Sequence, residues 1–163
     1  MTFPAQSLAL AKELLATCEA RGWHLATAES CTGGLIIGCL TEIAGSSNVV
    51  ERGYVTYDNR AKQEVLGIPP ELLASVGAVS EEVARAMAAG ARERAGVDLA
   101  VAVTGIAGPG GATPTKPVGL VHMAVAVREQ QTLHAKEIFA GDRSAVRLAT
   151  VDAALALALR AAA

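Results

Sequence analysis

The chain has 163 residues, of which 52% are hydrophobic and 18% charged, so it can bury a hydrophobic core and is not disordered. Its 14 basic and 16 acidic side chains give a net charge of -2 without a run of like charges, and only 3% of the residues are aromatic. These values exclude nucleic acids and anionic membranes as expected partners, because such partners need basic patches or stacking surfaces. We expect one domain over residues 1–163 with an aliphatic, alanine-rich core.

The cysteines and the chain ends indicate a cellular location. Cys18, Cys31 and Cys39 are odd in number and lack C-x-x-C spacing, so the sequence predicts neither a disulfide framework nor a zinc site. Charged residues interrupt the apolar segments near both ends, which argues against a signal peptide and a membrane span. We therefore expect a cytoplasmic protein.

In the first half of the chain, helical apolar spacing alternates with short runs rich in β-branched residues. The pattern predicts a helix over residues 5–20, a strand over 24–28, a buried helix over 33–43, a strand over 49–57 and a short helix over 60–66. Residues 71–75 are expected to add one helical turn after two prolines.

The second half continues the alternation. The sequence predicts a helix capped by Ser80, a buried strand over 99–103, a loop rich in Gly and Pro over 105–117, and a hairpin of strands over 118–127 and 132–139. Asp142 or Ser144 is expected to cap a last helix, whose nearly all-round Ala and Leu surface suggests burial against the sheet or a second subunit. The expected fold is α/β, a three-layer α/β/α sandwich with a mixed sheet.

The first motif that can carry chemistry is TAESCTGG, residues 27–34, where a strand leads into a helix. A hydroxyl at such a turn can act as a nucleophile, and amide groups near Cys31 to Gly34 can stabilise an anion. Ser30 is thus a candidate nucleophile. Alternatively, Ser30 or Thr32 simply caps the helix, and Cys31 is a weaker second nucleophile because no Cys, His and Asn/Asp set accompanies it.

A serine nucleophile needs a base. The three histidines, His24, His122 and His134, fall within predicted strands and fit structural or surface roles better than a catalytic triad. Lys62 is the better base if burial and a neighbouring cation lower its pKa, and Tyr57 could orient it or relay a proton. A solvated helical lysine is the alternative for Lys62.

The third motif is TGIAGPGG, residues 104–111, directly after the buried strand. Its glycines allow a ligand to approach the backbone, whose amide groups can bind a phosphate or an oxyanion. The motif is neither a Walker A loop nor a dinucleotide-binding fingerprint. A long loop at the carboxyl end of a strand still favours a binding site.

Together these motifs, with Tyr57-x-Asn59-x-x-Lys62 and Lys116-Pro117-Val118-Gly119, resemble the CinA C-terminal domain family, which includes nicotinamide-nucleotide amidases. The resemblance spans nearly the whole chain. It departs from the family at Ala112, where a third glycine is usual, and the larger molybdopterin-binding-like domain of longer CinA proteins is absent, as expected for a stand-alone member.

The resemblance implies a hydrolase that converts nicotinamide mononucleotide and water to nicotinate mononucleotide and ammonia in pyridine nucleotide salvage, with no cofactor and no metal. It implies Ser30 as nucleophile, Lys62 as base and Tyr57 in support. The expected substrate-binding residues come from all three motifs and the start of the last helix: Thr32, Gly33, Gly34, Asn59, Thr104, Gly105, Gly108, Gly110, Gly111 and Arg143.

Two rival functions remain open at this level. The same loops would also serve a non-catalytic module that binds a pyridine nucleotide and has a regulatory role. A nucleotide pyrophosphatase is less consistent with the sequence, which lacks an acidic metal cluster. The apolar last helix also leads us to expect a homodimer or an assembly of dimers.

Overall fold

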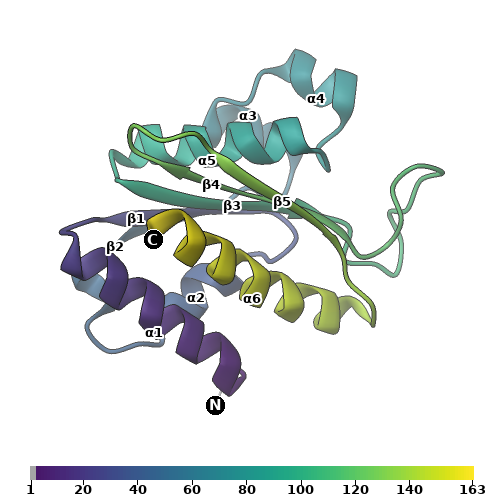
Figure 1. Ribbon diagram of the computed structural model, residues 1–163. Helices are drawn as coiled ribbons and strands as arrows, with labels where there is room; N and C mark the ends of the chain where they lie inside the picture. Colours follow the sequence, from purple (N-terminus) through teal and green to yellow (C-terminus); the bar gives the residue numbers. More distant parts are fainter. Residues whose placement is uncertain (1–2) are drawn as a thin grey trace.

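The computed structural model describes residues 3–163 and is built around one five-stranded sheet (Figure 1). The strand order is β2-β1-β3-β4-β5. The strands are β1 (Leu25–Glu29), β2 (Val50–Val55), β3 (Leu99–Gly105), β4 (Leu120–Val127) and β5 (Leu133–Ile138). Each overlaps the strand that the sequence predicts.

The sheet is mixed. Strands β2, β1 and β3 run parallel, whereas β4 is antiparallel to β3 and β5 is antiparallel to β4. The expected hairpin of β4 and β5 is therefore confirmed. Because β1, β2 and β3 run in the same direction, the loops that follow them emerge from one edge of the sheet.

Helices cover both faces of the sheet, as Figure 1 shows. One face carries α1 (Ala5–Ala20), α2 (Leu35–Thr41) and α6 (Arg143–Ala162), and the other carries α3 (Asn59–Leu66), α4 (Pro70–Val76) and α5 (Glu81–Ala95). A short 3-10 helix, η1 (Ser46–Asn48), precedes β2. This is the predicted three-layer α/β/α sandwich.

The two faces of the central strands differ in side-chain size. In β3, Leu99, Val101 and Val103 join the core under α1, α2 and α6, while Ala100 and Ala102 face α5. The same alternation continues in β4. Alanines on α5 complete the second core, so α5 packs closely on the sheet and the core fills without many aromatic rings.

Short polar side chains begin three of the helices. Ser80 caps α5 because its hydroxyl accepts from the backbone amide of Val83 at 3.3 Å. Asp58 caps α3 because its carboxylate accepts from the backbone amide of Arg60 at 2.7 Å. Asp142 caps α6 through the amide of Ala145 at 2.9 Å, which decides between the two predicted caps of this helix.

Helix α6 packs against α1, α2 and the sheet, so much of its apolar surface is covered within the chain. This burial is one of the two explanations that its sequence allowed. The homo-oligomer remains a prediction. Within residues 3–163, no helix has the length and apolar character needed to cross a membrane.

Candidate active site

The three sequence motifs meet around a cavity of about 250 Å³ beyond the carboxyl ends of the parallel strands. The turn after β1, the start of α3, the loop after β3 and the first residue of α6 all contribute to its wall. Most of the predicted site residues line it: Ser30, Tyr57, Asn59, Lys62, Thr104, Gly105, Gly108, Gly110, Gly111 and Arg143. The fold thus brings together residues that are far apart in the chain.

Ser30 and Lys62 are in direct contact at the base of this arrangement. The Nζ atom of Lys62 lies 3.0 Å from the Oγ atom of Ser30. Ser30 follows β1 immediately, and its backbone amide donates to the carbonyl of Val103 in β3, which fixes the serine at the edge of the sheet. The pair has the spacing expected of a nucleophile and its base.

Lys62 is buried, with only 1% of its surface exposed, so the solvated alternative is wrong. Its Nζ atom also donates to the carbonyl oxygens of Thr56 at 2.9 Å and Tyr57 at 3.2 Å. Desolvation lowers the pKa of Lys62 below its ordinary value, although the nearby Asp58 carboxylate and Cys31 thiol oppose this shift. The dominant effect favours the neutral amine that a base requires.

Cys31 also lines the cavity, next to Ser30. Only 5% of its surface is exposed, and burial raises the pKa of its thiol to about 11. The thiol is therefore protonated at neutral pH and is a poor nucleophile.

Glu29, the last residue of β1, is not among the residues predicted from the sequence. Its side chain is fully buried and accepts hydrogen bonds from the hydroxyls of Thr27 and Thr32 at 3.1 and 2.6 Å. It also accepts from the amides of Gly34, Ile36 and Ile37 at 2.8–3.1 Å. Glu29 therefore caps α2 in place of Ser30 or Thr32.

This network changes the role expected for the turn after β1. The amide of Gly34 binds the protein's own carboxylate, and the amide of Gly33 donates to the carbonyl of Ser30. Thr32, Gly33 and Gly34 do not line the cavity. The amides of Gly33 and Gly34 are thus engaged within the protein, whereas the amide of Cys31, which lines the cavity, has no hydrogen-bond partner among residues 3–163.

Arg147, near the start of α6, also binds the turn that follows β1. Its Nε atom donates to the carbonyl of Cys31 at 3.0 Å and its Nη2 atom to the carbonyl of Thr32 at 2.9 Å. Glu29 and Arg147 together hold the backbone that follows Ser30. A glutamate between Thr27 and Thr32, directly after an apolar strand, was the sequence signal that could have revealed the first of these contacts.

Arg143 joins two walls of the cavity. It donates to the carbonyl of Gly108 at 2.8 Å and to the phenol oxygen of Tyr57 at 2.9 Å. Tyr57 is 61% exposed, so its ring lies at the rim. Tyr57 contacts Lys62 through its main-chain carbonyl, which favours an orienting role over a proton relay through the phenol.

The loop after β3 forms the remaining wall. Thr104 is buried and donates to the carbonyl of Ala78 at 2.9 Å, while Asn59 is exposed at the start of α3. A Cβ atom on Gly105 would lie 2.7 Å from the Val121 side chain, and one on Gly108 would lie 2.6 Å from Val118. These two glycines are needed because larger residues would displace the hairpin behind the loop.

Amide groups of this loop are available to a ligand. Within residues 3–163, the amides of Ala107, Gly108, Gly110 and Gly111 have no hydrogen-bond partner, and all four residues line the cavity. No histidine is among the described residues that line it. The site therefore combines a serine, a buried lysine, free amides and one arginine.

The chain is similar to known proteins over most of its length. Residues 7–162 match the model of the CinA C-terminal domain. The chain is 50% identical over 151 residues to the nicotinamide-nucleotide amidohydrolase PncC of Enterobacter agglomerans, covering 93% of this chain and 92% of the relative. It is 57% identical over 134 residues to a CinA-like protein of Geotalea daltonii, of which it spans only 32%.

Solved structures show the same fold. The crystal structure of the competence/damage inducible protein CihA from Agrobacterium tumefaciens superposes with a TM-score of 0.96 at 50% identity, covering 99% of this chain and 98% of that one. A CinA superfamily protein from Enterobacter cloacae gives a TM-score of 0.92 at 32% identity, covering 100% of this chain and 95% of that one.

Proposed function

Because the chain belongs to the CinA C-terminal domain family, we propose that it is a nicotinamide-nucleotide amidase, which converts nicotinamide mononucleotide and water to nicotinate mononucleotide and ammonia. The observation that carries the proposal is the 3.0 Å contact between Lys62 and Ser30 in a cavity lined by free amides. The amidohydrolase from Enterobacter agglomerans supports the choice of substrate, since it matches along nearly its full length.

The contacts of Lys62 fit a base. A neutral amine has two N–H donors and one lone pair. The carbonyls of Thr56 and Tyr57 accept the two N–H groups, so the lone pair faces the third neighbour, the hydroxyl of Ser30. In this state Ser30 donates its proton toward Lys62 and its oxygen is prepared for attack.

The reaction is an acyl transfer. The Oγ atom of Ser30 attacks the carboxamide carbon as Lys62 takes the hydroxyl proton, and the carbonyl oxygen becomes an oxyanion. Lys62 returns the proton to the amide nitrogen, the C–N bond breaks and ammonia leaves. Water then attacks the ester with Lys62 again as base, which releases nicotinate mononucleotide and restores the serine. The free amides of Ala107 and Gly108 are the donors assigned to the oxyanion.

The nucleotide phosphate needs separate donors. Arg143 keeps N–H groups beyond the two that bind Gly108 and Tyr57, and it stands at the cavity rim beside glycine amides. A guanidinium and backbone amides form a common phosphate site. We assign phosphate recognition to Arg143 with Gly110 and Gly111.

The rest of the proposal follows the family and the sequence. The chain acts as an amidase domain in the cytoplasm, as a homodimer or an assembly of dimers, without metal or cofactor. The rival role, a regulatory module that binds a pyridine nucleotide without turnover, needs the nucleotide contacts but has no use for a serine beside a buried lysine.

The test is incubation of the purified protein with nicotinamide mononucleotide in the presence of EDTA, while ammonia and nicotinate mononucleotide are quantified. The proposal predicts equal amounts of both products and none with Ser30→Ala. Binding of the mononucleotide without product would establish the regulatory module instead. Turnover that stops with EDTA would contradict the metal-free mechanism.

A further inference from the structure

A second cavity, of about 400 Å³, lies beside the first, and Val79 lines both. It lies on the α5 face of the sheet, between the start of α5, the end of the 105–117 loop and strands β4 and β5. Thr104, His122 and Lys136 are neighbours across the β3, β4 and β5 registers. A polar row thus leads from the first cavity to the second.

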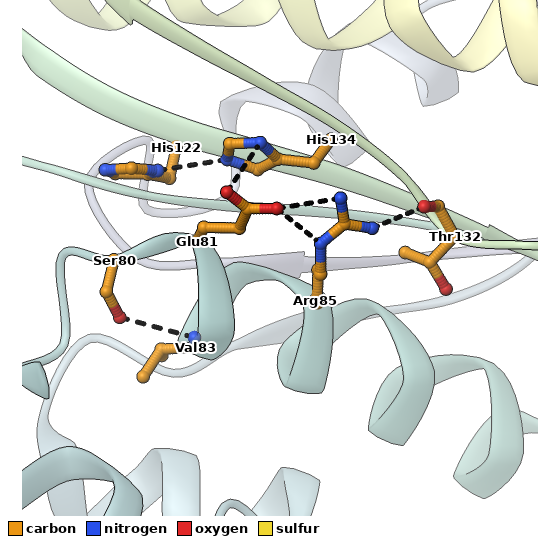
Figure 2. Close-up of polar contacts among 7 residues, drawn as sticks. All are labelled: Ser80, Glu81, Val83, Arg85, His122, Thr132 and His134. Carbon is orange, nitrogen blue, oxygen red and sulfur yellow. Dashed lines mark hydrogen bonds and ion pairs between the residues drawn. The ribbon is translucent and has the colours of Figure 1, made fainter. Parts of the chain in front are cut away.

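A chain of polar contacts ends in this cavity (Figure 2). The Nδ1 atom of His122 lies 3.0 Å from the Nε2 atom of His134, whose Nδ1 atom lies 3.6 Å from the Glu81 carboxylate. Arg85 binds the same carboxylate at 2.8 Å and also donates to the carbonyl of Thr132. The Glu81 carboxylate is therefore paired with Arg85 and lies at ion-pair distance from His134.

The contacts favour one arrangement of the ring protons. The tautomer that keeps a lone pair away from the Glu81 carboxylate, 3.6 Å from the Nδ1 atom of His134, carries its hydrogen on that atom and accepts from His122 at Nε2. The Nε2 atom of His122 is then left with a lone pair. Figure 2 shows this nitrogen pointing away from His134, and the His122 side chain is more than nine-tenths buried, with 8% exposed.

Two lysines line the same cavity as His122. Lys116 binds the carbonyl of Val76 at 2.6 Å and has two further N–H donors, and Lys136 extends from β5. The amides of the first two residues of α5 lie beyond the reach of intrahelical acceptors. Besides the Glu81–Arg85 pair, the remaining charged group is the Glu82 carboxylate, which one lysine offsets.

We propose that the second cavity binds a phosphate monoester, with one proton shared between a phosphate oxygen and the Nε2 atom of His122. A phosphate monoanion supplies the hydroxyl that a lone pair can accept from, and its other oxygens accept from the two lysines and the helix amides. The volume exceeds that of a bare phosphate ion and leaves room for the carbon skeleton of a monoester. The proposal does not depend on the amidase activity.

The test uses methyl phosphate as the probe and sulfate as its matched control at pH 6, where about half of a monoester carries one proton. The ring nitrogens of 15N-histidine-labelled protein are followed by NMR. We expect methyl phosphate to shift the Nε2 signal of His122 saturably, and sulfate, which has no proton to donate, to bind at least about tenfold more weakly.

Two variants locate the site. Lys136→Met removes an exposed side chain. It should weaken the binding of methyl phosphate, followed by the His122 shift, about tenfold, which is the cost of one charged hydrogen bond. Arg143→Met, in the first cavity, should leave it unchanged. The proposal is overturned by the absence of a His122 shift, by equal binding of sulfate, by loss of the effect in Arg143→Met, or by binding of inorganic phosphate but not of methyl phosphate.

Discussion

The Nζ atom of Lys62 lies 3.0 Å from the Oγ atom of Ser30, although the two residues are 32 positions apart in the sequence. The contact forms because β1 and β2 are parallel neighbours and end at the same edge of the sheet. It is buried and has carbonyl acceptors behind the amine.

Lys62→Arg should be nearly as inactive as Lys62→Met, because a guanidinium does not lose its proton in the working range. In the wild type, kcat/KM should rise with pH through an apparent pKa below the usual lysine value of about 10.4, since desolvation lowers the pKa of Lys62 and the neutral form is the active one. A pH–rate profile measures both effects. Substantial activity in Lys62→Arg would assign the lysine an electrostatic role only.

Glu29→Gln should destabilise the fold by about 2–4 kcal/mol, because an amide group cannot accept all five hydrogen bonds that the carboxylate accepts. It should also lower kcat, since the turn that carries Ser30 loses its support. Urea unfolding and steady-state kinetics measure the two effects. The matched control is Glu42→Gln, just after the same helix, where the side chain is exposed; an equal loss there would refute the specific role of Glu29.

Arg143→Ala should raise KM for nicotinamide mononucleotide about tenfold or more, because one charged hydrogen bond to phosphate is lost. The same variant should hardly change kcat/KM for nicotinamide riboside, which has no phosphate.

Tyr57→Phe removes only the phenol contact with Arg143 and should keep most of the turnover. A Tyr57→Phe enzyme with no turnover would restore the proton relay.

Much of the fold could be predicted from the sequence because its apolar periods are clear. The helices from Ala5 and Ser80, for example, have strong apolar faces or caps, and the structure places them within one or two residues of the prediction. Helix α2 begins at Leu35, two residues later than predicted. The delay has a physical cause, since residues before it wrap around the Glu29 carboxylate.

The site was less predictable, because the properties that matter come from distant segments. On its own helix Lys62 could equally be solvated, and only the neighbouring strands bury it. From the sequence alone, Glu29 is a polar residue at the end of a strand, and only the folded structure shows that it is fully buried. The pairing of His122 with His134 follows from a hairpin register that the sequence leaves open.

The proposed mechanism assigns nucleophilic attack to Ser30 and not to its neighbour Cys31. Ser30→Ala should abolish ammonia release while lowering stability by only about 1 kcal/mol, since the hydroxyl makes one hydrogen bond and does not cap α2. Cys31→Ser should remain active, because burial raises the pKa of the Cys31 thiol to about 11 and keeps it protonated.

The most direct measurement is mass spectrometry of enzyme quenched with acid during turnover of nicotinamide mononucleotide, with the acyl adduct located by peptide fragmentation. We predict a nucleotide ester on Ser30 in the wild type and in Cys31→Ser, and no adduct and no ammonia with Ser30→Ala. An adduct on Cys31, or ammonia release that persists in Ser30→Ala, would contradict the account.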